Sequence, residues 1–89
     1  MLYMVIEHFK NRDAKAVYGR FRKAGRMMPQ GLRYVSSWVE VDFARCFQLV
    51  ETEDTSLLEL WKEEWRDLID FEIVAVRTSA DAFSLVSGE

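Results

Sequence analysis

The feature that most constrains this chain of 89 residues is the order in which its apolar patterns follow one another. Four segments are rich in β-branched and aromatic residues and alternate, as half-buried strands do, whereas two others repeat apolar residues every three or four positions, as amphipathic helices do. The strand-like segments are Leu2–Phe9, Leu32–Val41, Ala44–Glu51 and Asp70–Arg77, and the helix-like segments run from Ala14 to Met28 and from Ser56 to Leu68. The predicted order is therefore strand, helix, strand, strand, helix, strand.

Local signals support this interpretation. Asn11 and Asp13 are candidate N-caps of the first helix. Trp61 and Trp65 lie about one turn apart on the apolar stripe of the second helix, and we interpret them as core residues because aromatic side chains dominate protein cores. A further apolar segment, Ser79–Val86, predicts a short C-terminal helix.

The order of elements is that of a ferredoxin-like βαββαβ sandwich, an α+β fold with a four-stranded antiparallel sheet. A chain of this size forms one domain, residues 1–89. Because 49% of its residues are hydrophobic, it carries more apolar material than one helical layer on one sheet hides. We therefore expect a second copy to cover the open sheet face, with Phe83 and Val86 sealing the subunit edge.

Charge is unevenly distributed along the chain. Residues 1–39 carry eight Lys and Arg against Glu7 and Asp13, and most of the acids follow Glu40. A basic first helix could attract phosphate, but the simpler interpretation is that it lies beside the acidic second helix. RNA-recognition motifs share this strand order, yet the segment Ala44–Val50 lacks their basic-aromatic pattern and the net charge is −3. We expect no nucleic-acid partner.

The chain lacks the sequence signals of export and of metal chemistry. Its first apolar segment is interrupted by Glu7 and His8 and has no basic region before it, so it resembles neither a signal peptide nor a membrane span. Cys46 is the only cysteine, which excludes an intramolecular disulfide and a CxxC site. One histidine and one cysteine are a poor set of metal ligands. We expect a cytoplasmic protein with no metal, no cofactor and no membrane partner.

The second and third strands carry the candidate ligand-binding residues. Ser36 and Trp38 could share a sheet face with Cys46 and Gln48, and alternation places Tyr34 on the same side as the first two. Polar groups on an otherwise apolar face need partners when they are buried. This patch is therefore either satisfied across a dimer interface or lines a pocket.

For catalysis the chain offers one weak candidate, His8, its only histidine. Histidine suits proton transfer near neutral pH. Alternation sends His8 and Glu7 to opposite faces of the strand, so the two do not form an acid–base pair. Cys46 has no neighbouring base in the sequence, which favours an inert, buried thiol over a nucleophile. Whether the protein is an enzyme is left open.

Four segments carry a resemblance to a known family: Met1–Phe9, Gly31–Trp38, Cys46–Leu49 and Asp70–Glu72. From Met1 to about Ser79 the chain resembles a small bacterial family of unknown function that is similar to the dimeric α/β-barrel superfamily. The resemblance implies two ferredoxin-like halves packed sheet to sheet, with a cavity beside each sheet or between the sheets. That superfamily includes cofactor-free oxygenases, muconolactone-type isomerases, haem-degrading enzymes and proteins with no known activity, so the fold does not select a function.

Taken together, these patterns predict a homodimer that binds a small, largely apolar or aromatic molecule in a cavity by the sheet. The alternative is a cofactor-free oxygenase or isomerase acting on an aromatic or polyketide-like substrate. In that case Trp38, Ser36 and Gln48 would orient the substrate, and His8 would move a proton.

Overall fold

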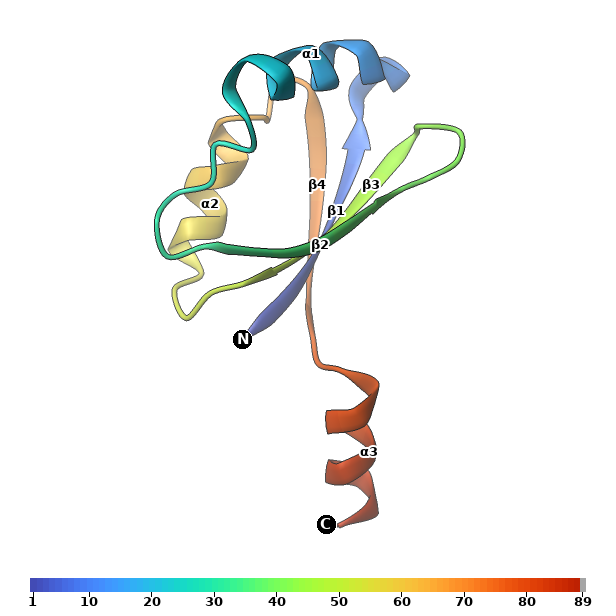
Figure 1. The fold of residues 1–89 in the computed structure, drawn as a ribbon, viewed down its shortest axis with the longest axis vertical. Helices are drawn as coiled ribbons and strands as arrows, with labels where there is room; N and C mark the ends of the chain where they lie inside the picture. Colours follow the sequence, from blue (N-terminus) through green and yellow to red (C-terminus); the bar gives the residue numbers. More distant parts are fainter. Residues whose placement is uncertain (89) are drawn as a thin grey trace.

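Residues 1–88, which the structure describes, form one four-stranded antiparallel sheet with two helices packed on one of its faces (Figure 1). The computed structural model orders the strands β2-β3-β1-β4. Its elements are β1 (Leu2–Phe9), the short 3-10 helix η1 (Lys10–Arg12), α1 (Ala14–Ala24), β2 (Arg33–Val39), β3 (Arg45–Glu51), α2 (Ser56–Glu63), β4 (Ile69–Val76) and α3 (Ser79–Ser87). The predicted ferredoxin-like α+β fold is confirmed.

The first strand, β1, is central, because it pairs with β3 on one side and with β4 on the other. Its alternation follows the predicted pattern: Val5, Glu7 and Phe9 are buried beneath the helices, and the residues between them are half-buried on the open face. A central strand needs apolar side chains on both faces, which explains why this segment has so few polar residues.

Two tryptophans anchor the helical layer to the sheet. Trp61 and Trp65 are 1% and 5% exposed, so their predicted place in the core is confirmed. Their indole N–H groups both donate to the main-chain oxygen of Arg26, at 2.8 and 3.0 Å. A buried indole without a partner would cost free energy. The core therefore also fixes the loop that follows α1.

The basic first helix meets the acidic segment after α2 through Arg20. Its guanidinium donates to both carboxylate oxygens of Asp67, each at 2.7 Å, and to the main-chain oxygen of Glu64 at 3.0 Å. These hydrogen bonds lower the pKa of Asp67 to about 2. This pair fits the interpretation that the charges of the two helices complement each other, although exposed ion pairs contribute little to stability.

A β-bulge interrupts β2. Tyr34 pairs with Val50 and Ser36 pairs with Leu49, which leaves Val35 as an extra residue. A bulge shifts the alternation of a strand by one position, so the residues after it face the opposite side from that expected. The prediction that Tyr34 and Ser36 share a face is therefore wrong.

The last helix, α3, extends away from the body of the domain beyond the end of β4 (Figure 1). Its N-cap is Thr78, whose hydroxyl accepts from the main-chain N–H of Asp81 at 3.0 Å. Phe83, Leu85 and Val86 are 71%, 62% and 89% exposed. The predicted terminal helix is confirmed, but the described residues leave its apolar side chains largely uncovered.

The loop before β2 gives a test of the fold. Gly31 has a φ of +96°, and a Cβ there would lie 2.9 Å from Cδ1 of Leu57 on α2. We expect Gly31→Ala to lower the free energy of unfolding by about 1–3 kcal/mol, because it adds both backbone strain and a clash. Gly19→Ala is the control, since a Cβ inside α1 meets nothing within 4 Å and should raise stability by about 0.5–1 kcal/mol. Urea unfolding followed by circular dichroism measures both, and equal effects of the two changes would contradict the prediction.

Candidate functional site

A cavity of about 270 Å³ lies between the helix-covered face of the sheet and the two helices. Its walls are mainly aromatic and aliphatic, and a few polar side chains interrupt them. The apolar lining residues are Phe9, Val17, Tyr18, Phe21, Val39, Trp61, Trp65 and Ile69, and the polar ones are Glu7, Arg26, Ser37, Cys46 and Gln48. Binding sites for small molecules have this composition, and drug-sized ligands occupy about 300–1,000 Å³, so this cavity suits a molecule of one or two rings.

Glu7 is the unusual residue of the cavity, because it is a carboxylic acid that is only 4% exposed. Gln48 Nε2 donates to its Oε2. Every fully buried side-chain oxygen or nitrogen in residues 1–88 has a hydrogen-bond partner. The other oxygen, Oε1, has no such partner among the described residues and so keeps access to the cavity.

Burial raises the pKa of Glu7 from 4.5 to about 7, because water no longer solvates the charged form. The hydrogen bond from Gln48 and the positive charge of Arg26 act in the opposite direction but are weaker. Glu7 therefore exchanges a proton near neutral pH, as acid–base groups in active sites do.

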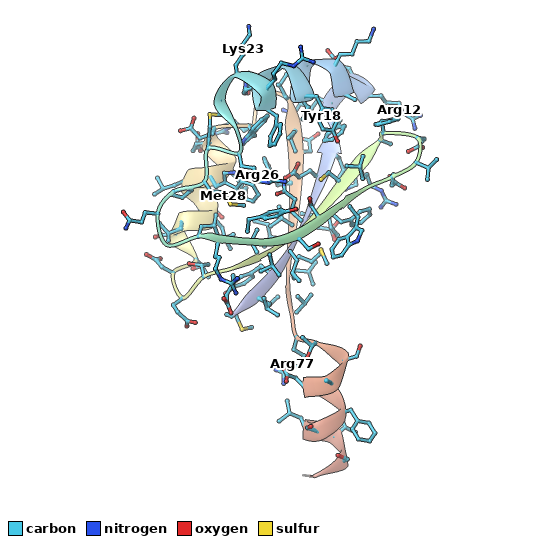
Figure 2. The ribbon with its side chains drawn as sticks, in the orientation of Figure 1. Arg12, Tyr18, Lys23, Arg26, Met28 and Arg77 are labelled. Atoms are coloured by element: carbon cyan, nitrogen blue, oxygen red, sulfur yellow. The ribbon has the colours of Figure 1, made fainter. Side chains whose placement is uncertain are left out.

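Arg26 is held at both its main chain and its side chain. Its Nε donates to Gln48 Oε1 at 3.2 Å, and its carbonyl accepts from the buried indoles of Trp61 in α2 and of Trp65 just after that helix. The guanidinium carbon lies 3.9 Å from the ring centroid of Tyr34 and 5.2 Å from that of Phe21. In Figure 2, Arg26 and Tyr18 lie on the side of α1 that faces the strands, while Lys23 points away from them. Arg26, Gln48 and Glu7 thus form a series of hydrogen-bonded side chains along the cavity wall.

Cys46 and Tyr18 contribute neutral groups. Burial and, less strongly, the nearby charge of Glu7 together raise the pKa of Cys46 to about 12, and Arg26 partly opposes them. The thiol is therefore protonated at neutral pH, in line with the inert role expected from the sequence. Burial also raises the pKa of Tyr18, so its phenol remains neutral. The Tyr18 ring meets Phe9 edge to face, with centroids 6.3 Å apart.

The structure separates the sequence-predicted ligand residues into two groups. Cys46 and Gln48 line the cavity, and Tyr34 lies beside it against Arg26. Ser36 and Trp38 lie on the open face, opposite Leu49 and Phe47 respectively. The expectation that these two share a face with Cys46 and Gln48 is wrong, because the bulge in β2 brings Ser37 and Val39 to the cavity side in their place.

His8 also lies on the open face. Its side chain is about half exposed, and its Nε2 lies 3.9 Å from Glu72 Oε1. The expectation that His8 and Glu7 point to opposite sides of β1 is confirmed by their burial and pairing. Of the two, Glu7 is the one that lines the cavity.

The family model described as Domain of unknown function (DUF3303) matches residues 1–89. The chain belongs to this family. Neither the comparison with curated proteins nor that with solved structures gives a match. Within residues 1–88 of this DUF3303 domain, no helix has the length and apolar character needed to cross a membrane, and no group of three or more His, Cys, Asp or Glu side chains could hold a metal ion.

Sequence reasoning missed three polar members of the site, Glu7, Arg26 and Ser37, and the phenol of Tyr18. One signal for Glu7 was available, because it is the charged member of an otherwise apolar, inward-facing set in β1. Nothing in the sequence marks Arg26, whose place depends on the loop held by the tryptophans. Ser37 needed knowledge of the bulge.

The buried carboxyl group predicts an unusual dependence of stability on pH. Because the pKa of Glu7 is higher in the folded state, the folded protein binds more protons than the unfolded chain between about pH 4.5 and 7. Stability should therefore fall as pH rises through this window, by up to about 3 kcal/mol from Glu7 alone. The neighbouring groups Arg26, Cys46 and Tyr18 keep their charge states over this range.

Urea unfolding at pH 5 and pH 8 measures this dependence. Glu7→Gln keeps a hydrogen-bond acceptor for Gln48 and removes the titration, so it should be less sensitive to pH than the wild type across this window. Glu72→Gln, on the open face, is the matched control and should keep the wild-type dependence. An equal pH dependence in wild type and Glu7→Gln would contradict the assignment.

Proposed function

We propose that this DUF3303 domain acts as a homodimer that binds a small, flat, largely aromatic molecule in the cavity between its sheet and helices. The observation that carries the proposal is a free carboxylate oxygen, Oε1 of Glu7, in an aromatic cavity. This oxygen is not fully buried, and in a largely apolar cavity a carboxylate oxygen without a protein partner needs water or a ligand to satisfy it.

The lining of the cavity indicates the chemistry of the ligand. Tyr18, Phe21, Trp61 and Trp65 offer ring faces and edges, which favour a planar molecule. Glu7 provides a hydrogen-bond acceptor or, when protonated, a donor. Together they favour a one- or two-ring aromatic compound with a polar substituent.

Binding is tested with 2-naphthol by isothermal titration calorimetry. We expect Phe21→Ala to raise the dissociation constant about tenfold, since it removes an aromatic wall of the cavity. Phe43→Ala is the matched control, because Phe43 lies exposed in the loop between β2 and β3.

Trp38→Ala separates the two faces of the sheet. The sequence placed the ligand against Trp38, whereas the cavity lies on the other face, so this variant should bind 2-naphthol as the wild type does. Loss of affinity in Trp38→Ala with normal affinity in Phe21→Ala would move the site to the open face and contradict the proposal.

The dimer part of the proposal is supported by the open face of the sheet. Its strands bring apolar side chains into two neighbouring rows. One row contains Trp38, Phe47 and Ile6, and the next contains Leu49, Met4 and Val74. Trp38 is 53% exposed and Val74 is 41% exposed. Contiguous apolar surface of this kind marks interaction sites in soluble proteins.

The position of α3 favours a second copy as the partner. A helix of nine residues is not stable alone in water, so its formation here implies packing that the described chain does not supply. It continues directly from β4, whose Val74 and Val76 belong to the open face. A second sheet placed on that face would lie within reach of Phe83 and Val86.

Sedimentation velocity tests the dimer. We expect a wild-type dimer at micromolar concentration, and Trp38→Glu and Phe83→Glu should each raise its dissociation constant by at least about tenfold, as loss of a buried interfacial aromatic typically does. Val41→Glu is the control, since Val41 is 98% exposed in the loop after β2. A wild-type monomer throughout a dilution series would overturn the dimer and leave the ligand site untouched.

A further inference from the structure

The carboxyl group of Glu7 is the most reactive group in the cavity, and ligand binding alone does not explain it. It sits on the central strand, at the cavity wall, with one oxygen bonded to Gln48 and the other directed to the space that a ligand would fill. A carboxylate with a purely structural role would stabilise the fold more if both of its oxygens accepted hydrogen bonds or if it were exposed to solvent. Here the fold keeps one oxygen free in an apolar enclosure.

We propose that Glu7 is a general base that removes a proton from the carbon beside a carbonyl group of the bound molecule, so that the domain catalyses proton shifts in small aromatic ketones. This inference rests on the proposed binding function and deepens it. It replaces His8 with Glu7 as the proton-transfer group, because Glu7 lines the cavity and His8 lies on the open face.

Arg26 provides the second group that such a reaction needs. Its Nε is used by Gln48, and its terminal guanidinium nitrogens donate no hydrogen bond to the described residues. Arg26 lines the cavity, and its guanidinium group is held in place by contacts with the rings of Tyr34 and Phe21. A fixed positive charge in an apolar site stabilises the negative oxygen that develops when a ketone loses a proton.

The step balances without a cofactor. The carboxylate of Glu7 accepts the proton, the electrons of the C–H bond form a carbon–carbon double bond, and the carbonyl π electrons move to oxygen to give an enolate. The carboxylic acid then returns a proton to the same carbon or, in an unsaturated ketone, to the carbon two bonds away. The molecule as a whole is neither oxidised nor reduced, so the reaction is an exchange or an isomerisation.

The surroundings of Glu7 suit this role. Burial brings its pKa to about 7, so a base and its conjugate acid are both populated at neutral pH. Tyr18 and Cys46 stay neutral there because burial raises the pKa of each. Arg26 remains positive and favours the ionised form of Glu7. The exchange rate should rise from pH 5 to pH 8 with a midpoint near 7.

The test uses the full chain with 2-indanone, a two-ring ketone, in deuterated buffer. Proton NMR follows the loss of signal at the carbons beside the carbonyl, with the rate in buffer alone subtracted, and calorimetry measures binding of the same compound. We expect the wild type to accelerate exchange and Glu7→Gln to reduce the protein-dependent rate by at least about 100-fold with binding within a few-fold of wild type. His8→Gln and Glu72→Gln, both on the open face, should exchange at the wild-type rate.

The other outcomes contradict either the role of Glu7, the class of ligand or the binding function. If 2-indanone binds and the wild type exchanges it no faster than Glu7→Gln does, the general base is wrong and the binding function stands. If 2-naphthol binds and 2-indanone does not, the ketone class is wrong. If neither compound binds at millimolar concentration, the proposed function itself fails. A sharp loss of rate in His8→Gln would return the proton transfer to the open face.

Discussion

The structure depends on two hydrogen bonds that converge on one atom, the main-chain oxygen of Arg26. Trp61 of α2 and Trp65, two residues beyond that helix, both donate to it, and these bonds hold the loop that follows α1. The next residue, Met27, has a φ of +57°, a conformation that costs free energy for a residue with a side chain. The indole bonds supply part of what holds the loop there. Without them the Arg26 side chain would not be placed over Tyr34 and beside Gln48.

From this anchor the polar part of the cavity follows. Arg26 orients the amide of Gln48, because its Nε selects the amide oxygen as acceptor and so leaves the amide nitrogen to donate to Glu7. Glu7 in turn has one oxygen committed and one free. The order of these contacts explains how a sheet can bury a carboxyl group on its central strand and still leave it available to a ligand. Burial raises the pKa of this group to about 7, and the contacts with Gln48 and Arg26 oppose part of that rise.

The spacing of apolar residues and the composition were sufficient to predict the order of the strands and helices. The alternation of β1 and the cap at Asp13 are local patterns, and both are confirmed: Asp13 accepts from the N–H of Ala16 at 3.1 Å. The helices are shorter than predicted, because α1 ends at Ala24 and α2 at Glu63, so Trp65 is buried as expected but lies beyond the end of α2. The site was less accessible, because it depends on non-local contacts. Cys46 and Gln48 were found from their strand, whereas Arg26 reaches the cavity only through a loop that is held by two residues 35 and 39 positions away. Trp38 was misplaced because a bulge leaves no clear mark in a sequence.

The bulge at Val35 has a wider consequence for how this family could change over time. The extra residue puts Tyr34 on the same side of β2 as Ser37 and Val39, which face the cavity, while Ser36 and Trp38 face outward. Substitutions at the outward positions can alter what the sheet packs against without altering the ligand wall, and the reverse also holds. The strand thus carries two independently variable sets of positions, and deleting Val35 would leave both on their present faces, because Tyr34 and Ser36 already pair with the consecutive residues Val50 and Leu49.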